Sequence, residues 1–355
     1  MHSLTSDHSM TASRRWAVLA GATALAYGVI TPPAWADLSP GGGTQGKTTQ
    51  TAQRDGHTIA SRVTFSGSTR NPSDQSSPAA TPVGNWSPPA CWYEPVSAQQ
   101  FSKEVEDGYK MVADDPQQPN YAKESVSEYR DIYKNGKYKN YNLDKADKGN
   151  WWVSAQDPTR LNDQAAWECS DLPFWVKNGD IPPVKKAVSP EILAELAYNR
   201  IQLPGTKASL APGDTTKVNL STWAWLDKAK FKKVSVTASL NVTGLNIQAT
   251  TTAEPVSLKL EPGTDDAETY PASGECAVSS DGSVGEPYAT GKADQAPPCG
   301  IKYLRSSGSG TFPLKATVTW RITWSGTGGV GGDLPDGTFG TTQEVTVQEI
   351  QAVNR

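Results

Sequence analysis

The chain has 355 residues, with 33 Lys and Arg against 37 Asp and Glu, so its formal net charge is −4. So small a charge argues against nucleic acid or an acidic membrane surface as a partner. Only one of the three histidines, His57, lies beyond residue 36, which argues against Ser-His-Asp, Cys-His and histidine-ligated zinc sites.

The first 36 residues have the features of an export signal. Arg14 and Arg15 precede the apolar stretch 16–30, and Ala34-Trp35-Ala36 fits a small-x-small cleavage site. The stretch is shorter than the roughly 18–20 residues that span a bilayer, and no second apolar span follows it. We therefore expect an extracellular protein, either secreted or retained at the cell wall, with an uncleaved anchor as the alternative.

Residues 37–90 have the composition of a linker. They are rich in Gly, Ser, Thr, Gln and Pro, and such a segment cannot bury enough apolar surface to form a core. One exception is 58–65, where Ile59, Val63 and Phe65 indicate a short strand. We expect the rest of this segment to be disordered.

Residues 91–203 carry helical patterns and many aromatic side chains. Ser97 begins a capping box ahead of an apolar stripe that starts at Phe101. A second helix is expected over 122–134, and a third after Ser189. We therefore expect a mainly helical domain with an irregular stretch between its second and third helices.

Residues 204–355 change to an alternation with a period of two. Apolar and polar side chains alternate most cleanly over 234–242, and the alternation returns at 245–249, 256–260 and 318–324. Short strands separated by Gly, Pro and Asp are typical of an antiparallel sandwich.

The segment 210–220, Leu-Ala-Pro-Gly-Asp-Thr-Thr-Lys-Val-Asn-Leu, resembles an early strand entry of bacterial immunoglobulin-like domains. In those domains Pro-Gly-Asp leads into an alternating strand. The resemblance implies an accessory or adhesive sandwich and carries no catalytic residue. The layout of the chain is also similar to that of secreted proteins of high-GC Gram-positive bacteria.

The expected fold class is therefore α+β and multidomain, with an N-terminal, mainly helical, disulfide-clasped domain and a C-terminal immunoglobulin-like β-sandwich. The expected divisions are a signal peptide (1–36), a disordered linker (37–90), the helical domain (91–203) and the sandwich (204–355), which contains an acidic insert (261–300).

Four cysteines remain beyond the export signal, an even number that suits an oxidising compartment. Three pairings are possible, and proximity in the sequence favours Cys91–Cys169 and Cys276–Cys299. The spacings contain no short Cys-x-x-Cys or Cys/His motif, so we expect no metal site. The second pair would pin the acidic insert at its base.

Carboxylate-pair chemistry survives these exclusions, because glycoside hydrolysis needs only two acids at about 5–10 Å. Glu168 and Asp171 beside Trp167 are the most interesting pair, since an aromatic wall can bind a sugar. The alternative is that they are ordinary solvated carboxylates near a disulfide. Other acids in the same region are Glu94, Glu104, Asp107 and Asp163.

Aromatic side chains offer a second possibility, a surface on which sugar rings stack. Trp151, Trp152, Tyr138 and Tyr141 are the candidates for such a ligand-binding platform. The alternative is that they form the core of a domain that is poor in Leu and Ile. Consecutive residues of an extended chain face opposite ways, so Trp151 and Trp152 cannot both point to one side.

We therefore expect a secreted, non-enzymatic binding or interaction protein of the cell envelope. Its partner would be a wall polysaccharide or another exported protein, and we expect no cofactor. The alternative is an enzyme that acts on polysaccharide through a carboxylate pair.

Overall fold

The computed structural model describes residues 48–54, 57–69, 79–205, 207–227, 229, 231–279, 281–292 and 294–350. The export signal expected over 1–36 lies outside these residues. Strands account for 42 % and helices for 18 % of the structure. Of the helices in the described ranges, none is long and apolar enough to cross a membrane.

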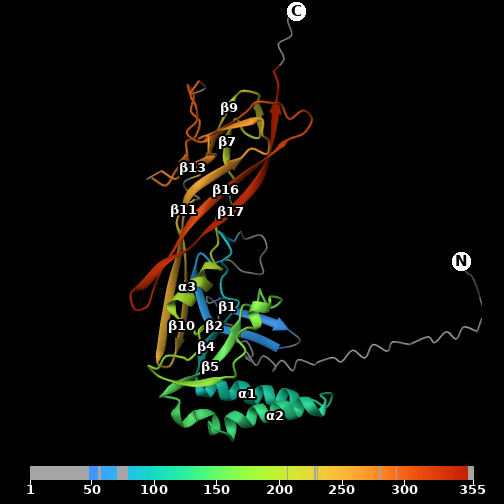
Figure 1. Ribbon diagram of the computed structural model, residues 1–355, viewed down its shortest axis with the longest axis vertical. Coiled ribbons are helices and arrows are strands. Elements are labelled where there is room, and N and C mark those ends of the chain that lie inside the picture. The colour runs from blue at the N-terminus through green and yellow to red at the C-terminus, as the bar shows by residue number, and fades with distance from the viewer. Residues whose placement is uncertain are drawn as a thin grey trace, which may run out of the picture. The chain divides into compact units, whose positions relative to one another are not determined.

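The largest sheet has nine strands, and its main path runs β1-β2-β10-β11-β16-β17-β3 (Figure 1). All neighbours on this path are antiparallel. Off the path, β13 pairs with β11 in antiparallel fashion and β8 pairs with β17 in parallel. The strands are β1 (Thr48–Arg54), β2 (His57–Gly67), β3 (Thr81–Pro82), β8 (Thr215–Lys217), β10 (Val234–Val242), β11 (Leu245–Glu261), β13 (Glu275–Ala277), β16 (Phe312–Gly326) and β17 (Val330–Gln348).

Strand β2 covers the short strand expected over 58–65, and it belongs to the large sheet. Phe65 of β2 lies opposite Ala238 of β10, and both side chains are buried. Residues from the segment expected to be a linker therefore complete one side of this sheet.

A bulge divides the long strand β11. The register against β16 shifts between Pro255 and Ser257, and the buried positions change from odd numbers such as Ala253 to even numbers such as Leu258. A bulge inserts one residue into one strand and so changes which side chains face the core. The two alternating segments at 245–249 and 256–260 are thus parts of one strand.

A second, five-stranded sheet packs into the same core as the large sheet. Its strands are β7 (Ser209–Ala211), β9 (Ser221–Leu226), β12 (Ala267–Tyr270), β14 (Val284–Gly285) and β15 (Gly300–Tyr303). Ile301 and Tyr303 of β15 share a buried cluster with Leu314 and Val318 of β16. The acidic stretch 261–300 supplies β12 and β14 to this sheet, and β13 to the large one.

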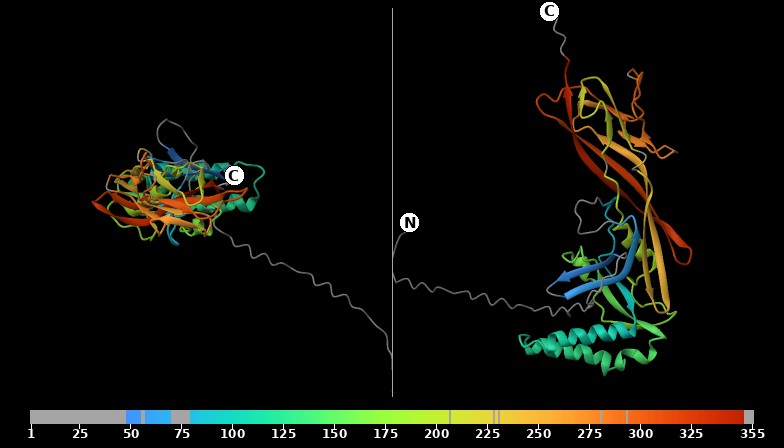
Figure 2. Two further views of the ribbon diagram at one scale, coloured as in Figure 1. Left: turned by 90° about the horizontal axis from the view of Figure 1, so that it is seen from above. Right: turned by 180° about the vertical axis from the view of Figure 1, so that it is seen from behind.

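The third sheet has three strands, β4 (Cys91–Val96), β5 (Gly149–Gln156) and β6 (Phe174–Lys177), in the order β4-β5-β6. Helices α1 (Ala98–Ala113) and α2 (Asn120–Lys134) lie side by side next to it, as both Figure 1 and Figure 2 show. The short helix η1 (Asn140–Lys145) contacts both of these helices. Helix α3 (Pro190–Tyr198) packs against β10, β11 and β16.

Helices α1 and α3 begin where their capping residues predict, whereas α2 begins after Pro119 without a side-chain cap. The Ser97 hydroxyl accepts a hydrogen bond from the Gln100 N–H, and the Ser189 hydroxyl accepts one from the Ile192 N–H, each at 3.2 Å. Phe101 and Val105 of α1 are buried, as their spacing of four residues indicates.

The expected α+β fold class, with a mainly helical N-terminal domain and an immunoglobulin-like sandwich, is wrong. The chain is mostly β, with curled antiparallel sheets. The interval between the second and third helices, which we expected to be irregular, contains β5 and β6. Strand β4 is buried at every position and β5 at all but one. Because such strands are covered on both faces, they show no alternation of polar and apolar residues.

Glu106 of α1 ties the helical layer together. Its carboxylate accepts hydrogen bonds from Lys134 at 2.8 Å, Tyr141 at 2.6 Å and Arg130 at 2.9 Å. Burial opposes ionisation of Glu106, but these three donors outweigh it and lower its pKa to about 2. One side chain thus holds α1 against both α2 and η1.

We predict that Glu106 makes the protein sensitive to acid. Its pKa is lower in the folded state than the unfolded value of about 4.5. Its contribution to stability is therefore complete above pH 4.5 and is lost as the pH falls toward 2. Glu106→Gln should lower the free energy of unfolding at pH 7 by roughly 1–2 kcal/mol after allowance for partial exposure. Urea unfolding at pH 7 and pH 3 measures this, and an equal deficit of the variant at both values would contradict it.

Candidate functional site

Both expected disulfides are present. Cys91 pairs with Cys169 and Cys276 with Cys299, and no cysteine is free. We call the first bridge the clasp, because it joins the start of β4 to the segment that follows the short helix η2 (Gln164–Trp167). Two disulfides indicate that the protein folds in an oxidising compartment.

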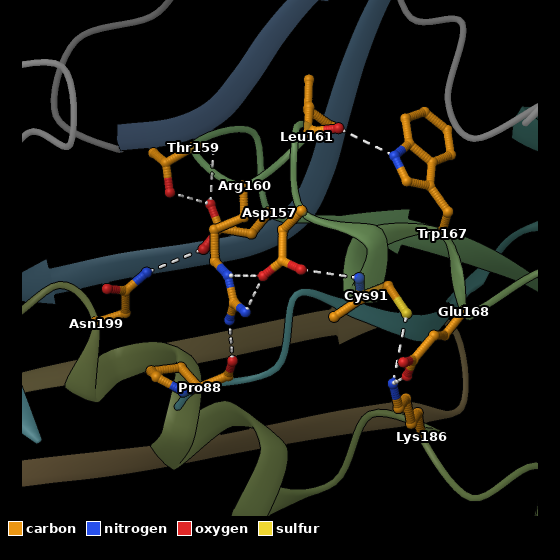
Figure 3. A network of polar contacts seen from close by, with 12 residues as sticks. Pro88, Cys91, Asp157, Thr159, Arg160, Leu161, Trp167, Glu168, Lys186 and Asn199 are labelled. Atoms are coloured by element: carbon orange, nitrogen blue, oxygen red, sulfur yellow. Dashed lines mark hydrogen bonds and ion pairs between the residues drawn. The ribbon is translucent and has the colours of Figure 1, made fainter. Parts of the chain in front are cut away.

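The clasp holds a surface segment, 157–171, that carries an exposed tryptophan. Trp167 is 38 % exposed, and its indole N–H donates a hydrogen bond to the Leu161 carbonyl at 3.0 Å (Figure 3). This bond fixes the orientation of the ring and satisfies its one polar atom. What Trp167 presents to solvent is therefore apolar ring surface.

The base of this segment is anchored by a buried acid, Asp157. Its Oδ1 accepts hydrogen bonds from the Thr159 N–H at 2.9 Å and the Thr159 hydroxyl at 2.7 Å. Its Oδ2 accepts one from the side-chain amide of Asn199 at 2.9 Å (Figure 3). Because Asn199 caps the C-terminus of α3, the segment is fixed to the helix that packs on the large sheet.

Charged side chains accompany Trp167 on the same segment. Asp163 caps η2 by accepting a hydrogen bond from the Ala165 N–H at 2.9 Å, and it forms an ion pair with Arg160. Glu168 forms an ion pair with Lys186 at 2.8 Å, and its side chain is 59 % exposed. The exposed ring is thus accompanied by polar groups that hydroxyl groups can hydrogen-bond.

The two acids singled out beside Trp167, Glu168 and Asp171, contact different partners. Glu168 contacts Lys186, whereas Asp171 Oδ2 accepts a hydrogen bond from the Tyr93 hydroxyl at 2.9 Å. The same hydroxyl accepts a bond from the Asp171 N–H at 3.0 Å. Asp171 therefore serves to hold the segment against β4, and no contact joins it to Glu168.

Two other candidate acids, Glu94 and Glu104, are brought together by one arginine. Arg62 donates from Nη1 to Glu94 Oε1 at 3.2 Å and from Nη2 to Glu104 Oε1 at 2.6 Å. The Trp92 indole N–H donates to Glu94 Oε2 at 2.8 Å. Glu94 is fully buried, so this pair ties β2, β4 and α1 together and does not face a substrate in solvent.

The four aromatic residues expected to form a stacking platform belong largely to the core. Trp151, Trp152 and Tyr141 are buried, and Tyr138 is half-buried. Trp151 contacts Phe101 at 4.4 Å and Tyr138 at 4.6 Å between ring centroids. The platform expected at these residues is therefore not supported, because neighbouring elements cover their rings.

Trp151 and Trp152 are both buried because the strand that carries them, β5, is covered on both sides. Trp151 points into the aromatic cluster under α1 and α2, whereas Trp152 points into the core of the two larger sheets. Consecutive strand residues do face opposite ways, as we expected. Both directions, however, lead into packed side chains.

One acid that the sequence did not single out is Glu195 of α3. Burial raises its pKa to about 7, the nearby Glu191 carboxylate adds to the effect, and a hydrogen bond from Trp86 opposes it. The pair Glu191 and Glu195, four residues apart on a largely apolar helix, is the pattern that could have revealed it.

Searches of protein-family profiles, of curated proteins and of solved structures found no match to this chain.

We predict that Trp151 is essential for stability. Trp151→Ala removes the centre of the aromatic cluster and the hydrogen bond from the indole N–H to the Tyr141 carbonyl, so it should cost about 3–5 kcal/mol. Tyr121→Ala is the control, because Tyr121 of α2 is 73 % exposed and should change stability by less than about 0.5 kcal/mol. Denaturant unfolding of both variants tests this, and similar small losses would place Trp151 outside the core.

We predict that Glu195 lowers stability at neutral pH and above. Its folded pKa of about 7 exceeds the unfolded value of 4.5, so its protonated form is favoured by folding, and stability falls as the pH rises from 4.5 to 7. Glu195→Gln should remove this decline and be more stable than the parent at pH 8. Glu191→Gln should have the same effect to a smaller degree. The urea unfolding midpoints at pH 5 and pH 8 test this. If the midpoints of the parent and of Glu195→Gln change with pH in parallel, the raised pKa does not belong to Glu195.

Proposed function

We propose that the chain is an exported binding protein of the cell envelope, and that Trp167 is the centre of a surface that binds a wall polysaccharide. The observation that carries this proposal is the exposed ring of Trp167, held in one orientation by its bond to the Leu161 carbonyl. The ring is large and apolar, yet 38 % of the residue remains in contact with solvent.

The chemistry of this surface suits a sugar. The C–H face of a pyranose ring is apolar and packs on an aromatic face, while its hydroxyl groups need hydrogen-bonding partners. Asp163, Arg160 and Glu168 supply such partners on the same segment. Because the segment is anchored through Asp157, little ordering entropy is lost when a ligand binds.

Export to the cell envelope is supported by two independent features. The first 36 residues have the pattern of a cleaved export signal, and the two disulfides suit an oxidising compartment.

The proposal assigns no catalytic step. Each acid that the sequence offered has a partner in the structure: Glu94 and Glu104 bind Arg62, Glu168 binds Lys186, Asp171 binds Tyr93, Asp107 binds Lys103, and Asp163 binds Arg160. These contacts support a binding role over hydrolysis through a carboxylate pair.

The test is co-sedimentation of the purified protein with the host's cell wall and with a panel of insoluble polysaccharides. We predict that Trp167→Ala weakens binding by about three- to tenfold, the usual range for loss of an aromatic contact. Trp167→Phe should retain part of the affinity. Tyr121→Ala is the matched control, since it removes an exposed aromatic ring from α2.

Unchanged binding of Trp167→Ala would remove this surface from the proposal. If the parent protein sediments with no polymer, the polysaccharide proposal fails, and crosslinking at the cell surface would then identify a protein partner.

A further inference from the structure

A lysine ammonium group lies beside one sulfur of the clasp. Lys186 Nζ is 3.8 Å from Cys91 Sγ and 2.8 Å from Glu168 Oε2 (Figure 3). The backbone places it there: the Tyr93 N–H donates to the Lys186 carbonyl, and the Val188 N–H donates to the Tyr93 carbonyl, each at 2.8 Å. The segment that carries Lys186 therefore pairs with β4, which begins at Cys91.

The two sulfurs of the clasp have different surroundings. Cys91 is fully buried and has the ammonium group beside it, whereas Cys169 is 4 % exposed and follows the exposed Glu168 directly. Both cysteines are buried, and Cys169 is the one that retains some exposure. Cys91 is the sulfur that an adjacent positive charge can stabilise as a leaving thiolate.

The second disulfide provides an internal comparison. Cys276 and Cys299 are buried to a similar extent as the clasp. The polar neighbour that the described residues provide for Cys276 Sγ is the Tyr270 carbonyl oxygen, at 3.6 Å. A carbonyl oxygen carries partial negative charge and does not favour a departing thiolate.

We propose that Cys169 is a thiol–disulfide exchange site for an exported dithiol oxidoreductase, with Lys186 as the positioning residue that stabilises the departing Cys91 thiolate. This proposal does not rest on sugar binding at Trp167, although Glu168 belongs to both surfaces.

The exchange proceeds in two steps. A thiolate of the dithiol attacks Cys169 Sγ and forms a mixed disulfide, while the Cys91–Cys169 bond breaks and leaves its electron pair on Cys91 Sγ. The second thiolate of the reductant then attacks the reductant's own sulfur in the mixed disulfide and releases Cys169 as a thiolate. The protein gains two electrons and, on protonation of both thiolates, two protons, and the dithiol becomes a disulfide.

The neighbouring charges set the rate in opposite directions. Lys186 favours the departing thiolate, and Glu168 weakens that effect because its carboxylate offsets part of the positive charge. Removal of the ammonium should slow exchange, and removal of the carboxylate charge should accelerate it.

The experiment follows opening of each disulfide in the native protein by dithiothreitol, with alkylation at timed intervals and peptide mass spectrometry. The clasp should open faster than Cys276–Cys299. Lys186→Met should slow the opening of the clasp by at least about threefold and leave the opening rate of the second disulfide unchanged. Lys186→Arg should retain the rate, and Glu168→Gln should increase it. Lys185→Met is the matched control, because Lys185 is an exposed neighbour.

A second measurement tests which sulfur is attacked. Reduced glutathione is a monothiol and cannot form an internal disulfide, so alkylation of the released cysteine traps the mixed disulfide, which is then located on Cys169 or Cys91. Glutathione on Cys91, or equal clasp rates in the parent and Lys186→Met, would overturn the proposal. Thermal melts with both disulfides intact show whether each variant is folded. If Lys186→Met is not folded, the rate at which the clasp opens in Glu168→Gln decides, and a rate no higher than that of the parent overturns the proposal.

Discussion

The burial of β5 on both faces is the constraint on which the rest of the structure depends. Trp151 fills the aromatic cluster beneath the helices, and Trp152, the next residue, fills the core of the larger sheets. Leu, Ile, Val and Phe together make up only about 17 % of the chain. Large aromatic rings supply much of the buried area that aliphatic side chains provide elsewhere. The strand leads directly to Asp157, and so it also sets the position of the segment that carries Trp167.

Buried charges complete this arrangement. Arg62 bridges Glu94 and Glu104, and so joins three elements that lie far apart in the sequence. Taking such charges out of water costs free energy. Each partner left alone would be an uncompensated buried charge, so the network stabilises the arrangement in which all three side chains meet. The network therefore holds β2 against β4 and α1, and with it the end of the large sheet formed by β1 and β2.

The sequence predicted the elements that have one covered face. Helices α1 and α3 are visible from their caps, α2 from its apolar spacing, and β10 from its alternation. The disulfide pairings followed from proximity. Strands β4 and β5 were not visible, since a strand covered on both sides has no polar face. Trp167 was noted only as a neighbour of Glu168 because the exposure of a tryptophan depends on what packs against it. Trp151, the more prominent candidate, proved to be core for the same reason.

The pairing of β2 with β10 has a consequence for how the chain reaches this state. The Thr64 hydroxyl donates to the Ser239 carbonyl across 175 residues of sequence, so β2 emerges early during synthesis and finds its partner late. A topology with such high contact order folds slowly, because the entropy of closing long loops is lost before the pairing stabilises the chain. Until β10 is in place, the edge of β2 stays open to other strands. The order of strands in this sheet thus leaves one side of β2 unpaired for as long as β10 is missing.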